Sequence, residues 1–208
     1  MVLKCICYSK SVLKIAKSYG WYPGAKYTNL RDIRSFNKIG FIDIEWKAYD
    51  FDKHIYALTQ TEPILTVAKD IENIKEFDEV IKQAEILNKY SKYVIIVPKD
   101  RKLSSHLEEI PSKYILGYSV PTKYGGTKIP IKYFNRPVHL LGGRPDTQIN
   151  LAAQMQVVSF DCNRFTLDAK YGYYFDGHSF RKNSVRNYQE CISSSLKNIN
   201  EMWRNYGK

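Results

Sequence analysis

The sequence lacks any apolar stretch long enough to cross a membrane. A membrane-spanning helix needs about 20 consecutive apolar residues, and no run of even about 18 uncharged apolar residues occurs. The apolar run at the start of the chain is short and is broken by Lys4, Lys10 and Lys14, which is unlike a secretory signal. We therefore expect neither a membrane span nor a membrane as partner.

Cysteine is also scarce, with four residues in a chain of 208. These are Cys5, Cys7, Cys162 and Cys191. They are too few and too widely spaced for a disulfide framework, and the pair at 5 and 7 has no second pair at zinc-binding spacing. We expect no metal and no cofactor. A reducing cytoplasm, that of the host if the protein is viral, is the expected location.

Acidic residues are in the minority. The chain has 21 Asp and Glu against 32 Lys and Arg, which gives a formal net charge of +11. This excess indicates an anionic partner, most commonly nucleic acid, although a lysine-rich proteome would give the same composition. No run of five basic residues locates a site. The hydrophobic share of 44% and the aromatic share of 14% exclude a disordered chain.

What the chain does have is a series of short apolar segments, most of them separated by segments of helical period. The expected strands are residues 2–8, 25–29, 41–46, 63–68, 93–97, 114–120, 138–141 and 157–160. Helices are expected over 11–20, after Asp50 and Asn73 as caps, near 103–109 and from Pro145. Continuous apolar strands, rather than alternating ones, indicate a parallel sheet that is buried on both faces.

Eight such units predict an α/β protein with a small (β/α)8 TIM-type barrel. We expect one domain over residues 1–208, with an amphipathic C-terminal helix over 183–206 packed on the barrel. An open doubly wound sheet with fewer strands is the alternative. The strand at 25–29 decides between them, because it is the least well defined and follows an expected turn at Pro23 and Gly24.

Charged residues follow several of the expected strands, at the end where barrel enzymes place their active residues. Asp43, Asp70 and Asp161 lie in or just after three apolar strands. Each carboxylate alone is more simply explained as a helix N-cap or a strand-end ion pair, whereas the set of three indicates a candidate site. The segment Gly142-Gly143-Arg144-Pro145 is a second candidate, because glycines beside a helix N-terminus favour an anion. A plain turn with an N-terminal proline is the alternative there.

The stretch from Arg136 to Phe165 resembles the end of the tRNA-guanine transglycosylase barrel. In that family a strand ends in a Gly-x-Gly turn followed by Lys-Pro-Asp, and one helix later another strand ends in Phe-Asp-Cys. The matching residues are LGGRPD at 141–146 and FDC at 160–162. Upstream, LGYSV at 116–120 resembles the glycine-containing strand that frames the base in that family.

The resemblance implies exchange of a guanine in nucleic acid for a 7-deazaguanine base. Asp161 corresponds to the nucleophile that attacks C1′ of the sugar and forms a covalent intermediate, as a carboxylate does in retaining glycosidases. Asp43 corresponds to the general acid/base, and Asp70 to the carboxylate that binds the base edge. The other expected substrate-binding residues are Lys99, Gly117, Ser119, Gly142, Gly143 and Arg144.

The sequence departs from the family at several points. The family's Asp-Ser-Gly-Gly is Asp43-Ile44-Glu45-Trp46 here, and the glutamine near the fifth strand is replaced by Pro98-Lys99. The zinc subdomain of the tRNA enzymes has no counterpart. These departures fit the minimal phage-type branch that modifies DNA better than the tRNA enzymes. A non-catalytic nucleic-acid-binding barrel of viral accessory type, and an N-glycosidase or deoxyribosyltransferase with the same aspartates, are the alternatives.

Aromatic and basic residues are interleaved toward the C-terminus, a pattern that suits stacking on bases and contact with phosphates. The aromatic residues Tyr171, Tyr173, Tyr174 and Phe175 precede the basic residues Arg181, Lys182 and Arg186. We expect the tyrosines to form a hairpin that closes the floor of the barrel. The three basic residues, together with Arg164, are expected to contact nucleic acid. His139 lies within a strand and is expected to be a core residue.

Overall fold

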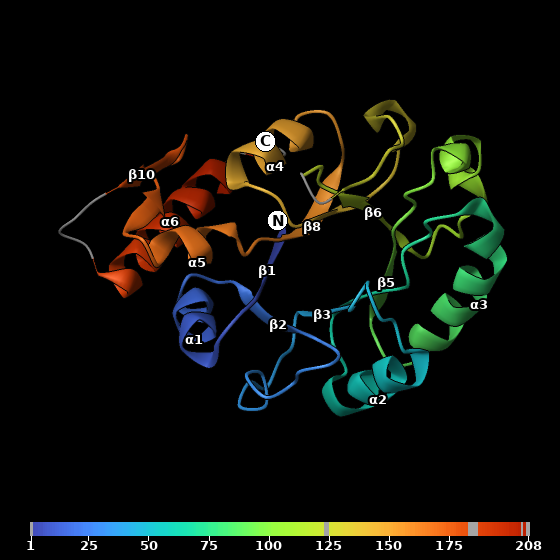
Figure 1. Ribbon diagram of the computed structural model, residues 1–208, viewed down its shortest axis with the longest axis horizontal. Helices are drawn as coiled ribbons and strands as arrows, with labels where there is room; N and C mark the ends of the chain where they lie inside the picture. The colour runs from blue at the N-terminus through green and yellow to red at the C-terminus, as the bar shows by residue number, and fades with distance from the viewer. Residues whose placement is uncertain (1, 123–124, 183–186, 205, 207–208) are drawn as a thin grey trace.

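Eight parallel strands close into a barrel in chain order in the computed structural model of the chain (Figure 1). The structure describes residues 2–122, 125–182, 187–204 and 206. The strands are β1 Leu3–Cys7, β2 Tyr22–Lys26, β3 Phe41–Asp43, β4 Leu65–Val67, β5 Tyr93–Ile96, β6 Ile115–Ser119, β7 Val138–Leu141 and β8 Val157–Asp161. Strand β1 pairs with both β2 and β8, which places Cys5 beside Asp161 and closes the barrel. The expected small α/β barrel is therefore confirmed.

The second strand begins earlier than its expected range of 25–29, and the turn expected at Pro23 and Gly24 is wrong. Both residues lie inside β2, and the Pro23 carbonyl accepts a hydrogen bond from the Gly40 N–H at 2.8 Å. A Cβ on Gly24 would lie 2.8 Å from both Cys7 Sγ and Phe41 O. Glycine therefore occurs here because β1, β2 and β3 approach closely, not because the chain turns.

The helices cover the outside of the barrel (Figure 1). In the described part of the chain they are α1 Lys10–Ser18, α2 Phe51–Thr61, α3 Phe77–Leu87, α4 Pro145–Ala152, α5 Arg164–Ala169 and α6 Tyr188–Arg204. Asp50 caps α2 as expected, because its side chain accepts a hydrogen bond from the Lys53 N–H at 3.1 Å. The helix expected near 103–109 is wrong. That segment forms two short 3-10 turns, Arg101–Ser105 and Leu107–Glu109, and buries one leucine in each. Helix α5 was not expected.

The C-terminal helix α6 packs on the outside of the barrel where β1 and β8 meet. The ring of Trp203 in α6 stacks on Phe160 of β8 with centroids 4.5 Å apart. A hairpin of β9 Tyr173–Phe175 and β10 Phe180–Lys182 lies against α5 and α6. It thus packs on these two helices at the periphery and does not close the floor of the barrel (Figure 1). The described part of the helix begins at Tyr188, and residues 183–186 lie outside the described residues.

No helix in the described ranges is both long and apolar enough to cross a bilayer.

Candidate active site

A pocket of about 910 Å³ opens at the carboxyl ends of the barrel strands. It is lined by Asp43 at the end of β3, by Asp70 and Lys99 after β4 and β5, and by Asp161 at the end of β8. Ser119, Gly142 and Gly143 complete the set of expected residues in its lining. We call this pocket the acidic mouth. The barrel topology therefore brings the three expected carboxylates, which are far apart in sequence, to one place.

Asp161 is held in a fixed position at the end of β8. Its Oδ1 accepts a hydrogen bond from the Gly142 N–H at 2.9 Å. The amide of Gln148 donates to the carbonyls of both Gly142 and Asp161 at 2.7 Å, which ties the loop after β7 to the end of β8. Gly142 and Gly143 have φ values of 60° and 89°, which favour glycine. The glycine pair therefore serves to place a backbone donor on the Asp161 carboxylate.

Asp43 faces the same pocket from the end of β3. Its Oδ1 accepts a hydrogen bond from the Ile44 N–H at 2.8 Å. Burial, followed by the negative charge of nearby Asp161, raises the pKa of Asp43 from its ordinary 3.8 to about 7. Near neutral pH the mouth therefore holds a carboxyl that still carries its proton for part of the time, beside a hydrogen-bonded carboxylate. Such a pair combines a proton donor with a potential nucleophile.

Lys99 joins two acidic side chains at the other side of the mouth. Its Nζ lies 2.6 Å from Asp70 Oδ2 and 3.0 Å from Glu72 Oε1. Burial alone would lower the pKa of Lys99, but the charges and hydrogen bonds of Asp70 and Glu72 outweigh it and raise that pKa. Lys99 is therefore protonated at neutral pH and is unsuited to attack a carbonyl as a free amine.

His139 contacts the site from below, which sequence reasoning missed. It is fully buried, as expected for a core residue, and its ring stacks on Phe41 with centroids 5.1 Å apart. Its Nδ1 lies 2.8 Å from Ser159 Oγ, and its Nε2 lies 3.5 Å from Asp161 Oδ1. That Nε2 has no hydrogen-bond partner among the described residues. The alternation of β7 could have revealed it, because His139 faces inward beneath the loop that orients Asp161.

Gly117 does not line the mouth. A Cβ on Gly117 would lie 2.6 Å from Val97 Cγ2 and 2.8 Å from Ile95 Cγ2, so the residue packs inside the barrel. The structure explains this glycine by close packing of β5 against β6, and its expected contact with substrate gains no support.

Two expected basic residues border a neighbouring pocket of about 610 Å³. Arg144 and Arg164 line it together with the glycine pair, so they flank the mouth rather than enter it. Each is held by an acidic neighbour, Arg144 by Asp146 at 3.1 Å and Arg164 by Asp168 at 2.9 Å. The guanidinium of Arg144 also lies 5.0 Å from the centre of the Phe180 ring in the hairpin.

The remaining basic candidates lie on the hairpin. Arg181 pairs with Asp176, and the Nζ of Lys182 lies 5.9 Å from the centre of the Tyr173 ring. Neither lines the acidic mouth. Arg186 lies outside the described residues. A role for these residues in binding nucleic acid stays a prediction.

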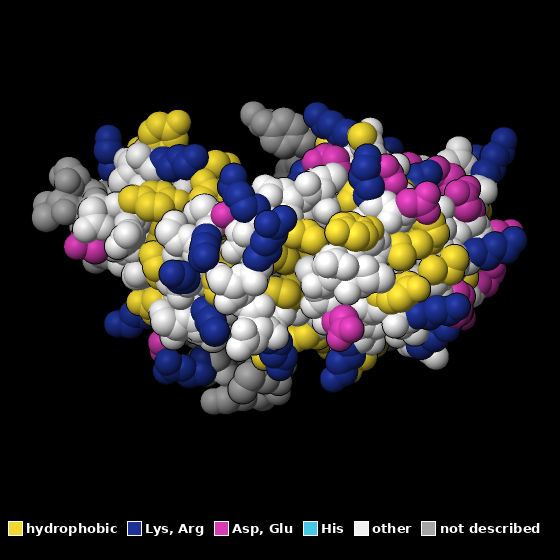
Figure 2. Space-filling model, turned by 90° about the horizontal axis from the view of Figure 1, so that it is seen from below, with side chains coloured by type: hydrophobic (Ala, Val, Ile, Leu, Met, Phe, Trp, Pro, Cys, Tyr) yellow, Lys and Arg dark blue, Asp and Glu magenta, His cyan; other side chains and the backbone are white. Residues whose placement is uncertain are grey.

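The surface charge is unevenly distributed. On the face shown in Figure 2, Lys and Arg side chains are spread widely, whereas Asp and Glu gather toward the end of the molecule that α3 occupies. Within the described ranges, no group of three His, Cys, Asp or Glu side chains is placed to hold a metal ion.

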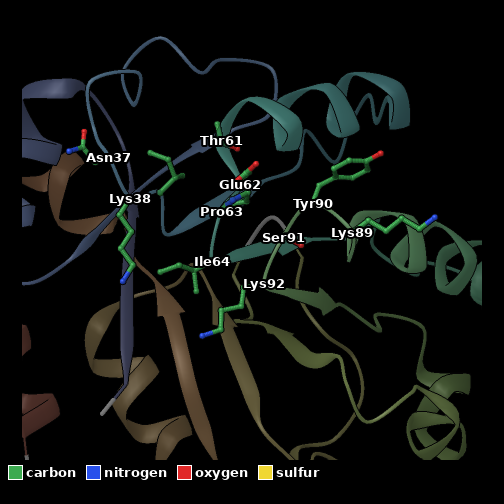
Figure 3. A pocket seen from close by; sticks show the side chains of 11 residues that line it. Asn37, Lys38, Thr61, Glu62, Pro63, Ile64, Lys89, Tyr90, Ser91 and Lys92 are labelled. Carbon is green, nitrogen blue, oxygen red and sulfur yellow. The ribbon is translucent and has the colours of Figure 1, made fainter.

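A further pocket, of about 560 Å³, lies at the opposite end, before β3, β4 and β5 (Figure 3). The charged side chains that line it are Lys38, Glu62, Lys89 and Lys92, and all four are exposed. None of the residues expected in a functional site is among its lining residues. We call it the amino-end pocket.

Comparisons with known proteins identify the fold and a family. A family model described as "Family of unknown function (DUF6610)" matches residues 16–204. Among solved structures, the fold is similar to that of the YdjI aldolase from Escherichia coli K12, with a TM-score of 0.58 and 10% identity. The match covers 99% of this chain and 91% of the aldolase chain, and at this identity it shows the fold alone. No curated protein matches the chain.

Proposed function

The chain belongs to the DUF6610 family of unknown function, and from its acidic mouth we propose that it is a transglycosylase. The proposed reaction replaces a guanine in nucleic acid, DNA rather than tRNA, by a 7-deazaguanine base. The single observation that carries the proposal is the pairing of Asp43 with Asp161, in which one carboxyl has a pKa of about 7 and the other is fixed by a backbone N–H.

The pair can perform the exchange in two balanced steps. A carboxylate oxygen of Asp161 attacks C1′ of the nucleotide and forms a covalent ester-like bond, while the N-glycosidic bond breaks and the guanine nitrogen takes the proton of Asp43. The incoming 7-deazaguanine then gives its ring N–H proton to the Asp43 carboxylate. Its nitrogen attacks C1′ and releases Asp161. No proton or electron pair is left over.

Other residues of the mouth suit binding and orientation. Asp70, held by Lys99 at 2.6 Å, presents an acceptor for the N–H groups of a guanine edge. Ser119 and the glycine pair line the same pocket, and Arg144 and Arg164 flank it where phosphates of the strand would pass. The elevated pKa of Asp43 favours a catalytic role over a purely binding one. Burial of this carboxyl costs free energy, and binding of nucleic acid alone would gain nothing from it.

The proposal is tested with a labelled 7-deazaguanine and a single-stranded DNA or a tRNA that contains guanine. We expect the native protein to transfer the label into nucleic acid and to release guanine in equal amounts. Asp161→Asn is expected to lower the rate by about 10⁴-fold or more, because no nucleophile remains. Glu62→Gln in the amino-end pocket is the matched control and is expected to retain the rate.

The alternatives give different results in the same assay. Guanine release without incorporation of label would replace the proposal by N-glycoside hydrolysis. Incorporation or release that is unchanged in Asp161→Asn, or the absence of both in the native protein, would overturn it.

A further inference from the structure

A single tryptophan stands exposed at the acidic mouth. The chain has three tryptophans. Trp21 and Trp203 belong to the core and are 2% and 5% exposed, whereas Trp46 is 54% exposed. Trp46 lines the same pocket as Asp43 and Asp161. A large aromatic face presented to solvent beside buried carboxylates is a feature that the proposed chemistry does not use.

Positive charge surrounds this indole. The Nζ of Lys47 lies 5.3 Å from the centre of the ring and that of Lys99 lies 5.8 Å from it. Lys26 and Lys128 line the same pocket. Lys26 and Lys99 are engaged with Glu45 and with the Asp70 pair, while Lys47 and Lys128 are exposed side chains. The rim of the mouth therefore carries an exposed indole and two exposed lysines, Lys47 and Lys128, together with the exposed carboxylate of Glu72, which pairs with Lys99.

This combination matches one class of ligand. Proteins that bind single-stranded nucleic acid combine aromatic faces, on which bases stack, with lysines and arginines along the path of the backbone. In a duplex the bases adjacent to a flipped nucleotide stay paired within the helix, so covering an indole with one of them requires a second unstacking step. A free base would leave the lysines of the rim without a phosphate, and a mononucleotide would supply one phosphate but no neighbouring base to cover the indole.

We infer that Trp46 is the platform on which the base next to the exchanged nucleotide stacks, so that the substrate is a single-stranded nucleic acid. Lys47 and Lys128 hold the phosphates on either side of that base. The inference rests on the proposed function, since it names the substrate class of the same site. It adds a residue without a counterpart in the Asp-Ser-Gly-Gly motif of the tRNA-guanine transglycosylases, because Trp46 stands where that motif ends in glycine.

Fluorescence can observe this residue separately. Because Trp46 is the exposed tryptophan and the other two are buried, a base stacked on it quenches one part of the emission and leaves the core signal as an internal reference. We would titrate Asp161→Asn, which does not turn over, with a single-stranded oligodeoxynucleotide of about eight residues that contains one guanine. Quenching of the exposed fraction is the expected result.

Affinity gives the quantitative test. Anisotropy of a dye-labelled oligonucleotide is expected to show that Trp46→Leu weakens binding by about 5- to 150-fold, the range for losing one base–aromatic stack. Trp46→Phe is expected to retain most of the affinity. The matched control is Tyr56→Leu, because Tyr56 on α2 is 65% exposed and is not among the lining residues of the mouth, and its loss is expected to leave the affinity unchanged.

Each remaining outcome would overturn the inference. Equal affinities for the native protein and Trp46→Leu would exclude the platform. A blunt duplex of the same sequence that binds as well as the single strand, with the same dependence on Trp46, would exclude the single-stranded substrate. Deoxyguanosine monophosphate that binds as tightly as the oligonucleotide would indicate a small-molecule site instead. These are binding measurements and do not depend on turnover. A protein that binds single strands through Trp46 but exchanges no base would therefore contradict the proposed function and not the role of Trp46.

Discussion

The two ends of the barrel differ in whether their charged side chains are buried or exposed. At the carboxyl end, Asp70 and Asp161 are buried and Asp43 is partly buried, all lining one pocket. At the amino end, the four charged side chains of the amino-end pocket are exposed. Burial of a carboxylate costs free energy that an exposed charge does not incur. The difference indicates that the carboxyl end holds groups in states useful for chemistry, while the amino end is an ordinary solvated surface.

Hydrogen bonds show the same contrast in two buried histidines. His54 lies on the buried face of α2, where Tyr49 OH and Thr66 Oγ1 approach its two nitrogens at 3.1 and 2.7 Å. Burial lowers the pKa of His54 to about 4, so it is neutral and structural. His139 lies inside the barrel, and one of its nitrogens faces Asp161 without a normal hydrogen bond. A histidine with both nitrogens engaged stabilises the fold, whereas the unpartnered Nε2 of His139, 3.5 Å from Asp161 Oδ1, stays available to that carboxylate.

After Asp161→Asn, the largest effect at the carboxyl end is expected from substitution of Asp43. Asp43→Asn should lower kcat/KM for base exchange by about 10²- to 10⁴-fold, because the leaving guanine loses its proton donor. In the native protein kcat/KM should fall as the pH rises above about 7, since Asp43 must carry a proton to act as an acid. Incorporation of labelled base measured across pH checks both statements. A native pH profile that stays flat between pH 6 and pH 9, or a variant as fast as the native protein, would contradict this role.

The two histidines provide a smaller and sharper contrast. His139→Leu leaves Asp161 with the Gly142 N–H as its described donor, and we expect kcat to fall about 10- to 100-fold with KM nearly unchanged. His139→Gln keeps an N–H donor and should recover part of the loss. His54→Leu should lower the free energy of unfolding by about 1–3 kcal/mol without changing kcat. Steady-state kinetics and urea unfolding of all three variants test the contrast. Equal effects of His139→Leu and His54→Leu on kcat would contradict the different roles assigned to the two histidines.

The smallest effect concerns stability. The pKa of Asp43 in the folded protein is about 7, above its ordinary 3.8, so the folded state keeps a proton that the unfolded state has already lost between these values. The contribution of Asp43 is therefore fully favourable below about pH 4 and is lost as the pH rises to about 7. We expect Asp43→Asn to exceed the native protein in unfolding free energy by about 1–3 kcal/mol at pH 8 and to lose this advantage near pH 4. Urea unfolding at both pH values measures it, and no difference at pH 8 would contradict the burial of a carboxyl at this site.

Much of the barrel was predictable because its strands are continuous apolar runs followed by polar residues. It was also predictable that Asp43, Asp70 and Asp161 line one pocket, because the carboxyl ends of parallel strands lie at the same end of a barrel. Strand β2 was misplaced because Pro23 and Gly24 usually mark a turn, and only the spacing to Cys7 and Phe41 shows why glycine is needed in the strand.

Other features depend on contacts that no local pattern records. Gly117 was expected to contact the guanine base. Instead, its lack of a side chain leaves the space that the side chains of Val97 and Ile95 occupy. The relation of His139 to Asp161 depends on the pairing of β7 with β8, which aligns His139 with Ser159. The exposure of Trp46 likewise depends on the short length of β3. This strand ends at Asp43, so that Trp46 lies beyond it on the rim of the mouth.

The central claim is that Asp161 forms the covalent bond while Asp43 moves the proton. The most direct measurement is the mass of the protein after a denaturing quench of its reaction with a guanine-containing oligonucleotide, in the absence of free base, followed by peptide mapping. The account predicts an adduct of the oligonucleotide minus guanine on the peptide that contains Asp161, present in native protein and absent in Asp161→Asn. An adduct on another residue, or one that persists in Asp161→Asn, would contradict it.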